Sequence, residues 1–218
     1  MTTSSVAVVD YGSSNLRSVA KALEYVAGTR HKIIVSGDAG EIVRADRIVF
    51  PGQGAIGDCM QSLHAASLVA ALKQVIKTRP FLGICLGLQS LMTTSDEDNG
   101  VACLDLFAGK VQRFRSDAGL DVNGSPRKIP HMGWNQVHWR KPHPLVEGIS
   151  TGSRFYFVHS YYVVPEDGAV IMGETEHIHR FVSALASGNA FATQFHPEKS
   201  ADAGLRLLHN FLDWNGET

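Results

Sequence analysis

Residues 80–89 read Pro-Phe-Leu-Gly-Ile-Cys-Leu-Gly-Leu-Gln and predict a buried strand, 80–84, that turns sharply into a helix over 86–92. The strand shows no polar alternation, which is typical of a parallel sheet covered on both faces. Glycines flank Cys85 in a Gly-x-Cys-x-Gly pattern, which permits a strained turn that exposes the central side chain. Cys85 is therefore a candidate nucleophile, and the alternative is a structural thiol, because free cysteine is often buried.

The chain before this turn alternates short apolar strands with amphipathic helices. Apolar residues recur with helical spacing over 16–26 and in the stretch 63–76. Together these segments predict a mostly parallel central sheet flanked by helices, the α/β class. The predicted strands of this half lie at 6–10, 33–35, 47–50 and 80–84.

The second half of the chain is rich in β-type runs. Between Lys110 and Phe195 these runs predict hairpins and mixed strands added to the same sheet, and residues 200–213 return to a helix. Ser116–Pro130 is rich in Gly, Pro, Asp and Asn, which predicts a mobile loop. The predicted strands of this half lie at 110–114, 133–139, 154–164, 169–173, 181–186 and 190–195.

Composition limits the possible functions. The 218 residues carry 20 Lys and Arg against 21 Asp and Glu, a net charge of -1, which argues against nucleic-acid binding. The chain has no linker, no repeat, no signal peptide and no apolar run long enough to span a membrane, so we expect one cytoplasmic domain over residues 1–218. Three cysteines without a CxxC pair indicate reduced thiols. The expected substrate is a small molecule.

A second chemical signal is Gln194-Phe-His196-Pro-Glu198, at the end of an apolar run. Proline disfavours the helical region for its predecessor, so we expect His196 to be extended. Residues i and i+2 of an extended segment point the same way, so His196 and Glu198 would approach one site together. A cysteine, a histidine and an acid form the arrangement that activates a thiol for acyl transfer.

Two further patterns concern the same site or a metal. The turn Pro51-Gly-Gln-Gly54 follows a strand, and its backbone N–H groups, with that of Leu86, could stabilise an oxyanion. An ordinary turn is the alternative. His177 and His179 are a close histidine pair without cysteine or carboxylate partners at ligand spacing. We expect them on a polar strand face, and we expect neither a metal nor a cofactor.

Six motifs, taken together, resemble the class I, triad-type glutamine amidotransferases, which release ammonia from the side-chain amide of glutamine. Two of them, at 130–135 and 156–161, are similar to the glutaminase subunits of imidazole glycerol phosphate synthase. The resemblance covers nearly the whole chain. The motifs are Asp10-Tyr-Gly-Ser-Ser-Asn-Leu16, Pro51-Gly-Gln-Gly-Ala-Ile-Gly-Asp58, Gly83-Ile-Cys-Leu-Gly-Leu-Gln89, Pro130-His-Met-Gly-Trp-Asn135, Tyr156-Phe-Val-His-Ser-Tyr161 and Gln194-Phe-His-Pro-Glu-Lys-Ser200.

The resemblance implies a role for each matching residue. Cys85 would be the nucleophile, His196 the general acid/base and Glu198 its orienting partner. The oxyanion region would comprise Gly52, Gln53, Gly54 and Leu86. The amino-acid end of glutamine would contact Gln89, Ser160 and Tyr161, and the partner interface would include Asn15, Tyr156 and Lys199.

The resemblance also implies the reaction and the partner. Glutamine would be hydrolysed to glutamate through a γ-glutamyl thioester. The ammonia would pass to a (β/α)₈-barrel cyclase subunit, which makes imidazole glycerol phosphate and aminoimidazole carboxamide ribotide in histidine biosynthesis. Three alternatives remain: another amidotransferase of this class, such as the glutaminase of anthranilate synthase or of pyridoxal phosphate synthesis; a non-catalytic module of the same fold; and a cysteine peptidase.

Overall fold

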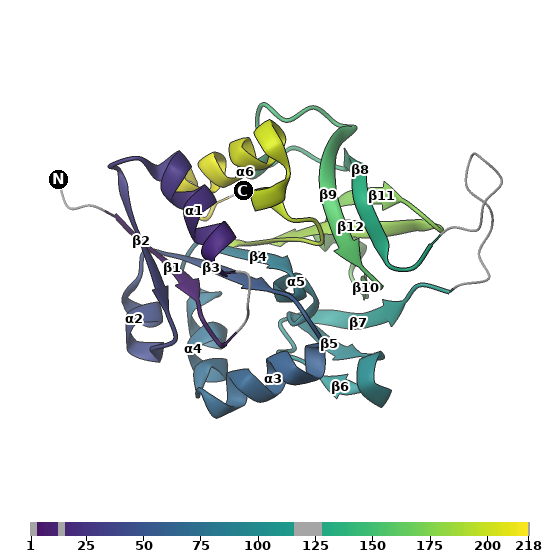
Figure 1. The fold of residues 1–218 in the computed structure, drawn as a ribbon, viewed down its shortest axis with the longest axis horizontal. Coiled ribbons are helices and arrows are strands. Elements are labelled where there is room, and N and C mark those ends of the chain that lie inside the picture. The colour runs from purple at the N-terminus through teal and green to yellow at the C-terminus, as the bar shows by residue number, and fades with distance from the viewer. Residues whose placement is uncertain (1–3, 13–15, 116–127, 218) are drawn as a thin grey trace.

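The structure, a computed structural model, describes residues 4–12, 16–115 and 128–217 (Figure 1). The predicted interface residue Asn15 and most of the predicted loop Ser116–Pro130 lie outside the described residues. Among the described residues, no helix combines the length and the apolar character needed to cross a membrane.

The N-terminal half forms the parallel part of the sheet, in the strand order β2-β1-β3-β4. Its strands are β1 (Ser4–Val9), β2 (His31–Ser36), β3 (Arg47–Gly52) and β4 (Phe81–Cys85). Side chains alternate between the two faces: Val6 and Val8 belong to one hydrophobic cluster, and Ala7 and Val9 to the other. Both faces are therefore buried, as the unbroken apolar runs predict.

Helices cover both faces of this sheet (Figure 1). One face carries α1 (Leu16–Ala27) and α6 (Ala201–Asp213), and the other carries α2 (Ala39–Arg44), α3 (Ile56–Ala65) and α4 (Leu68–Val75). The expected helical stretch 63–76 is divided between α3 and α4, because Ser67 adopts a left-handed conformation with φ 57°. Helix α2, which is only 6 residues long, was not predicted.

The C-terminal half extends the sheet with mixed strands in the order β4-β13-β12-β10-β7-β5-β6, which confirms the predicted fold class. Strands β8, β9 and β11 branch from β12 and lie to one side (Figure 1). The strands are β5 (Met92–Ser95), β6 (Val101–Ala102), β7 (Phe107–Arg113), β8 (His131–Trp139), β9 (Ser153–His159), β10 (Tyr161–Pro165), β11 (Ile171–Glu176), β12 (Arg180–Ser187) and β13 (Ala190–Thr193). Short 3₁₀ turns occur at η1 (Glu97–Asn99), η2 (Pro144–Val146), η3 (Gly168–Val170) and η4 (Pro197–Lys199).

Three local predictions were wrong in this half. The helix after Cys85, α5 (Leu86–Gln89), is a single turn and not a helix to residue 92, because residues from 92 onward join the sheet as β5. The predicted strand 154–164 is interrupted at Ser160 and forms β9 and β10, which pair with different neighbours. The segment 177–179 is the bend between β11 and β12 and not a strand face.

Parallel pairing gathers three strand ends at one edge of the sheet. Strand β4 lies between β3 and β13, and Gly52 pairs with Cys85 in the register. The carboxyl ends of parallel strands meet at the same edge, which is where open α/β sheets form their sites. The segments after β3, β4 and β13 therefore converge around Cys85.

The turn at Cys85 depends on a close approach between α5 and β3. Cys85 adopts φ 54° and ψ −105°, a strained conformation for a residue other than glycine. A Cβ atom at position 87 would collide with the carbonyl oxygen of Phe50. Glycine at position 87 is thus required for α5 to begin directly at the end of β4.

Replacing Gly87 with Ala is expected to lower the free energy of unfolding by about 3 kcal/mol, because backbone atoms of β3 must move. Urea denaturation followed by circular dichroism would measure this loss. Gly168→Ala is the matched control, since a Cβ atom at position 168 meets no described atom within 4 Å; its effect should stay within about 0.5 kcal/mol. Equal effects of the two substitutions would contradict the proposed packing.

Candidate functional site

The structure brings together the three residues predicted to form a triad. Cys85 and His196 line the same cavity and interact electrostatically. His196 Nδ1 lies 2.9 Å from Glu198 Oε1, and both of these side chains are almost inaccessible to solvent. The imidazole of His196 therefore faces the cavity that Cys85 also lines and is bonded to a buried carboxylate.

The local structure of the His196–Glu198 pair differs in one respect from the prediction. His196 is extended before Pro197, as expected, with φ −101° and ψ 98°. Glu198, however, lies in the 3₁₀ turn η4, and it is this turn that brings its carboxylate to Nδ1. The expectation of a continuous extended segment was wrong, because proline at the first position of η4 favours helical dihedrals in the residues that follow.

Ser200 fixes the backbone of His196 relative to strand β9. Its hydroxyl donates to the carbonyl oxygen of His196 at 2.6 Å and accepts from the backbone N–H of Tyr156 at 3.0 Å. The backbone N–H of His196 donates to the carbonyl oxygen of Tyr156 at 2.9 Å. The histidine backbone is thus fastened to strand β9 at two points.

The charges around His196 favour its protonated form. Burial alone would lower the pKa of the imidazole, but the electrostatic interaction with Cys85, together with Glu198, raises the pKa to about 10. An imidazole with this pKa is protonated at neutral pH. A thiolate is the reactive form of cysteine toward a carbonyl carbon.

A cavity of about 410 Å³ opens onto Cys85 and His196. Gly52 is not among its lining residues, although it pairs with Cys85 in the sheet. Four further residues line the cavity: Pro130, Val158 and His159, which belong to the motifs at 130–135 and 156–161 but had no assigned role, and Glu97, which lies outside all six motifs. The predicted residues that line the cavity, besides Cys85 and His196, are Gln53, Gly54, Leu86, Gln89, Ser160 and Tyr161.

Glu97 supplies a carboxylate to this cavity from the turn η1. Burial raises the pKa of its carboxyl, and the backbone N–H of Ile56, at the start of α3, donates to it at 3.1 Å. An acidic residue in a surface turn resembles many others in the sequence, so no pattern distinguished Glu97.

Two of the predicted interface residues, Tyr156 and Lys199, adjoin residues of the site, and the third, Asn15, lies outside the described residues. Lys199 is exposed and Tyr156 is half-buried. The ring of Tyr156 packs edge to face with that of Trp134, at 6.2 Å between centroids. Met132 and Trp134, on the adjacent strand β8, are exposed to 63% and 44%, which is unusual for large apolar side chains.

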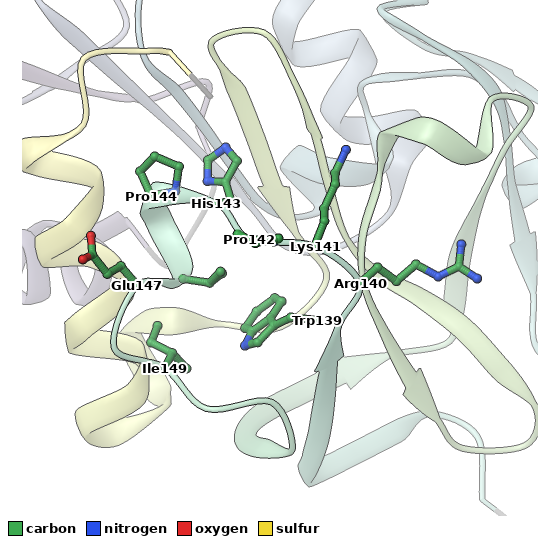
Figure 2. Close-up of a pocket in the computed structure, with 9 residues that line it drawn as sticks. Trp139, Arg140, Lys141, Pro142, His143, Pro144, Glu147 and Ile149 are labelled. Carbon is green, nitrogen blue, oxygen red and sulfur yellow. The ribbon is translucent and has the colours of Figure 1, made fainter.

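A second cavity, of about 710 Å³, lies away from Cys85 and is formed by residues of the segment 139–149 (Figure 2). Arg140 and Lys141 point away from the ring of Trp139 in this view. His143, which lines this second cavity, packs against Phe191 and Trp214, and burial lowers the pKa of its imidazole to about 4. Its described lining residues include no nucleophile paired with a base, so the cavity at Cys85 is the candidate active site.

The described histidines form no metal site. His177 and His179 pack around the ring of Phe114, and His177 Nε2 lies 3.1 Å from the carbonyl oxygen of Lys128. Within residues 4–12, 16–115 and 128–217, no three His, Cys, Asp or Glu side chains are arranged to hold a metal ion.

Comparison with known proteins defines the class. The family model "Glutamine amidotransferase class-I" matches residues 7–214, so the chain belongs to the class-I glutamine amidotransferases. Solved structures with the same fold include a putative GMP synthase component from Thermoplasma acidophilum, with a TM-score of 0.70, 19% identity and coverage of 98% of this chain and 94% of that chain. The glutaminase domain of Trypanosoma brucei CTPS has a TM-score of 0.63 at 17% identity, with 98% and 95% covered.

Curated relatives identify the particular branch of the family. The chain is 54% identical to the imidazole glycerol phosphate synthase subunit HisH of Hydrogenovibrio crunogenus, over 97% of each chain. It is 53% identical to the HisH of Nitrosococcus oceani, over 98% of this chain and 99% of that protein. The chain therefore belongs to the HisH family of glutamine amidotransferase enzymes.

The stability of the protein should depend on pH through its buried histidines, of which His131 and His159 have the lowest pKa values. Burial, followed by the charges of neighbouring histidines, lowers the pKa of His131 to about 2; burial is the main cause that lowers the pKa of His159 to about 3. Below about pH 6.5 the unfolded chain binds protons at these positions and the folded protein does not, so stability falls as the pH falls. We expect a loss of about 1.4 kcal/mol per histidine for each pH unit between 6.5 and 4.

Urea denaturation at pH 7.5, 6.0 and 5.0 would measure this dependence. The exposed His64 provides the control, because His64→Asn should leave the slope unchanged. A free energy of unfolding that is constant from pH 7.5 to 5.0 would contradict the neutral, buried state of His131 and His159.

Removal of Cys85 should lower the pKa of His196. In Cys85→Ala the electrostatic interaction that raises this pKa is lost, while burial, which lowers it, remains. Titration of the imidazole followed by ¹⁵N NMR would measure the change, with Cys103→Ala as the control. An unchanged pKa in Cys85→Ala would show that the thiol and the imidazole do not interact.

Proposed function

We propose that this chain is a single amidotransferase domain that hydrolyses L-glutamine to glutamate and ammonia through Cys85, His196 and Glu198. We propose further that the ammonia passes to a (β/α)₈-barrel cyclase subunit, which uses it to make imidazole glycerol phosphate and aminoimidazole carboxamide ribotide. The meeting of Cys85 and His196 on one cavity, with Glu198 Oε1 2.9 Å from Nδ1 of His196, carries the proposal. The membership of the HisH family supports it.

The first half of the reaction forms a thioester. The Cys85 sulfur attacks the side-chain amide carbon of glutamine, and a carbon–sulfur bond forms while the carbonyl oxygen becomes an oxyanion. The proton on His196 is transferred to the amide nitrogen, the carbon–nitrogen bond breaks, and ammonia leaves. Glu198 accepts a hydrogen bond from Nδ1, so that Nε2 is the nitrogen that exchanges the proton.

The second half restores the enzyme. Water gives a proton to Nε2 of His196 and adds its oxygen to the thioester carbon. The carbon–sulfur bond then breaks, glutamate leaves, and the pair returns to a thiolate and an imidazolium. The oxyanion in both halves is formed beside the N-terminus of α5, where the N–H of Leu86 has no acceptor within the helix. Gly52, Gln53 and Gly54 form the other side of this region.

The remaining lining residues suit the amino-acid end of glutamine. The carboxylate of Glu97 can bind the ammonium group of the substrate. Gln89 Nε2 donates hydrogen bonds to the carbonyl oxygen of Tyr161 and to the side-chain oxygen of Gln194. Its Oε1 therefore remains as an acceptor for the same ammonium group. Ser160 and Tyr161 also line the cavity, and the carbonyl oxygen of Tyr161 accepts the hydrogen bond from Gln89.

The surface beside the site suits a protein partner. The exposed side chains of Met132 and Trp134 adjoin Tyr156, whose backbone is bonded directly to His196. Lys199 follows Glu198 in the sequence, and its side chain is exposed. The relatives are named as subunits, which fits the docking of a cyclase over this surface.

Cys85→Ala should abolish glutamine hydrolysis, with a loss of at least about a thousandfold in turnover. A coupled assay for glutamate, performed in the presence of the cyclase, would measure it. Cys103→Ala is the matched control and should keep full activity, because burial raises the pKa of the Cys103 thiol to about 12 and it lies outside the cavity. Retained hydrolysis in Cys85→Ala would refute the mechanism.

The partner is tested by assay of the chain with and without a (β/α)₈-barrel cyclase and its nucleotide ligand. We expect slow hydrolysis of glutamine by the isolated chain and strong stimulation by the liganded cyclase. Trp134→Ala, which removes an exposed apolar side chain, should weaken binding of the cyclase while preserving the fold. Full activity of the isolated chain, with no effect of the cyclase, would argue against this partner.

A further inference from the structure

We propose that Gln194 is a further residue of the reaction centre, which donates a hydrogen bond to the Cys85 thiolate and is oriented by a chain of hydrogen bonds that extends to His131. Gln194 Nε2 lies 3.7 Å from Cys85 Sγ, within hydrogen-bonding range for sulfur. The side chain is fully buried and does not line the cavity. Gln194 therefore contacts the sulfur of Cys85 from the protein interior and not from the cavity. This role rests on the proposed function of Cys85.

One backbone carbonyl determines the direction of the hydrogen bonds toward the sulfur. The carbonyl oxygen of Tyr161 can only accept, so the group of Gln89 that lies 3.0 Å from it must be its amide nitrogen. The same nitrogen lies 3.1 Å from the side chain of Gln194, which must present its oxygen there. The nitrogen of Gln194 consequently faces Cys85.

The same carbonyl determines the tautomers of two histidines on its other side. His159 Nδ1 lies 2.7 Å from the Tyr161 oxygen and must carry a proton. His159 Nε2 is then an acceptor, and it receives a hydrogen bond from His131 Nδ1 at 2.9 Å. His131 Nε2 in turn accepts from the Asn135 amide at 3.1 Å. Both rings are neutral in this arrangement, in agreement with the lowered pKa values of His131 and His159.

This arrangement gives His131 and His159 the role of positioning residues. His159 and Gln89 donate to the same oxygen atom of Tyr161, so the position of that oxygen depends on both. Gln89 then fixes the rotation of the Gln194 amide. A hydrogen bond to a charged acceptor is stronger than one to a neutral acceptor, so the N–H of Gln194 favours the thiolate over the thiol.

The thiolate has charged and titratable neighbours that must be kept constant in a test. His196 and Glu198 approach it from η4, and the other titratable groups that line the cavity are Glu97, His159 and Tyr161. Substitution of Gln194 leaves all five of these groups in place. A change in the reactivity of Cys85 in such a variant therefore reports the lost amide.

The test is the rate at which iodoacetamide alkylates Cys85 in the full-length chain between pH 5 and 9. The modified Cys85 peptide is quantified by mass spectrometry, because Cys59 and Cys103 are also free thiols. In Gln194→Met, which keeps the length of the side chain but lacks the donor, we expect alkylation at pH 7 to slow about tenfold, the effect of one lost hydrogen bond to a charged group. The turnover of glutamine should fall similarly while KM changes less than about twofold, since Gln194 does not line the cavity.

Ser183→Ala is the matched control. Ser183 is fully buried on the adjacent strand β12, its hydroxyl has no hydrogen-bond partner among the described residues, and its backbone oxygen accepts from the N–H of Gln194. This variant should alkylate at the rate of the natural protein. An unchanged alkylation profile in folded Gln194→Met, or an equal loss in Ser183→Ala, would overturn the proposal.

A second pair of variants tests the inference if Gln194→Met does not fold. His159→Leu removes the donor to the Tyr161 oxygen, whereas His159→Asn keeps an amide donor near the position of Nδ1. We expect alkylation of Cys85 to slow about threefold in His159→Leu and to recover in His159→Asn. Equal rates in the two variants would refute the role of His159. These readouts need no turnover, so they are separate from the question of whether Cys85→Ala abolishes hydrolysis.

Discussion

The site depends on the close packing of the first turn of α5 against the end of β3. Only a glycine at position 87 avoids the carbonyl oxygen of Phe50, and this contact permits the chain to turn at Cys85 without an intervening loop. The cost is a backbone strain at Cys85 of about 1–3 kcal/mol. In return the sulfur is held rigidly at the edge where β3, β4 and β13 end, so that residues from positions 52, 85 and 196 meet.

The parts of the structure that follow from local sequence were predictable. The apolar run before Cys85, its flanking glycines and the His-Pro-Glu segment are short patterns whose geometry is set within a few residues. The parallel half of the sheet follows in the same way from unbroken apolar runs separated by amphipathic helices. The triad residues could be chosen from the sequence because each occurs at a predicted strand end.

The parts that depend on pairing between distant segments could not be predicted. Glu97 reaches the cavity because η1 packs near the start of α3, and nothing in residues 97–99 indicates this position. His131 and His159 meet because they are directly opposite in the register of β8 and β9, which period-two patterning does not determine. Glu198 was expected to reach His196 from an extended strand, and its 3₁₀ turn depends on packing against α6.

The branch of the sheet formed by β8 and β9 has a mechanical consequence. In the described residues, β8 pairs with β11 through only Gly173–Trp139 and Glu174–His138, whereas β8 and β9 pair with each other along their whole length. The hairpin is thus joined to β11 over a short contact, its inner side chains Phe155 and Phe157 are fully buried, and its exposed side chains include Met132 and Trp134. The carbonyl oxygen of Tyr156, on strand β9 of this hairpin, accepts a hydrogen bond from the backbone N–H of His196. A displacement of this hairpin would therefore reach the backbone of His196 at two points, directly through the Tyr156 carbonyl and indirectly through the Ser200 hydroxyl.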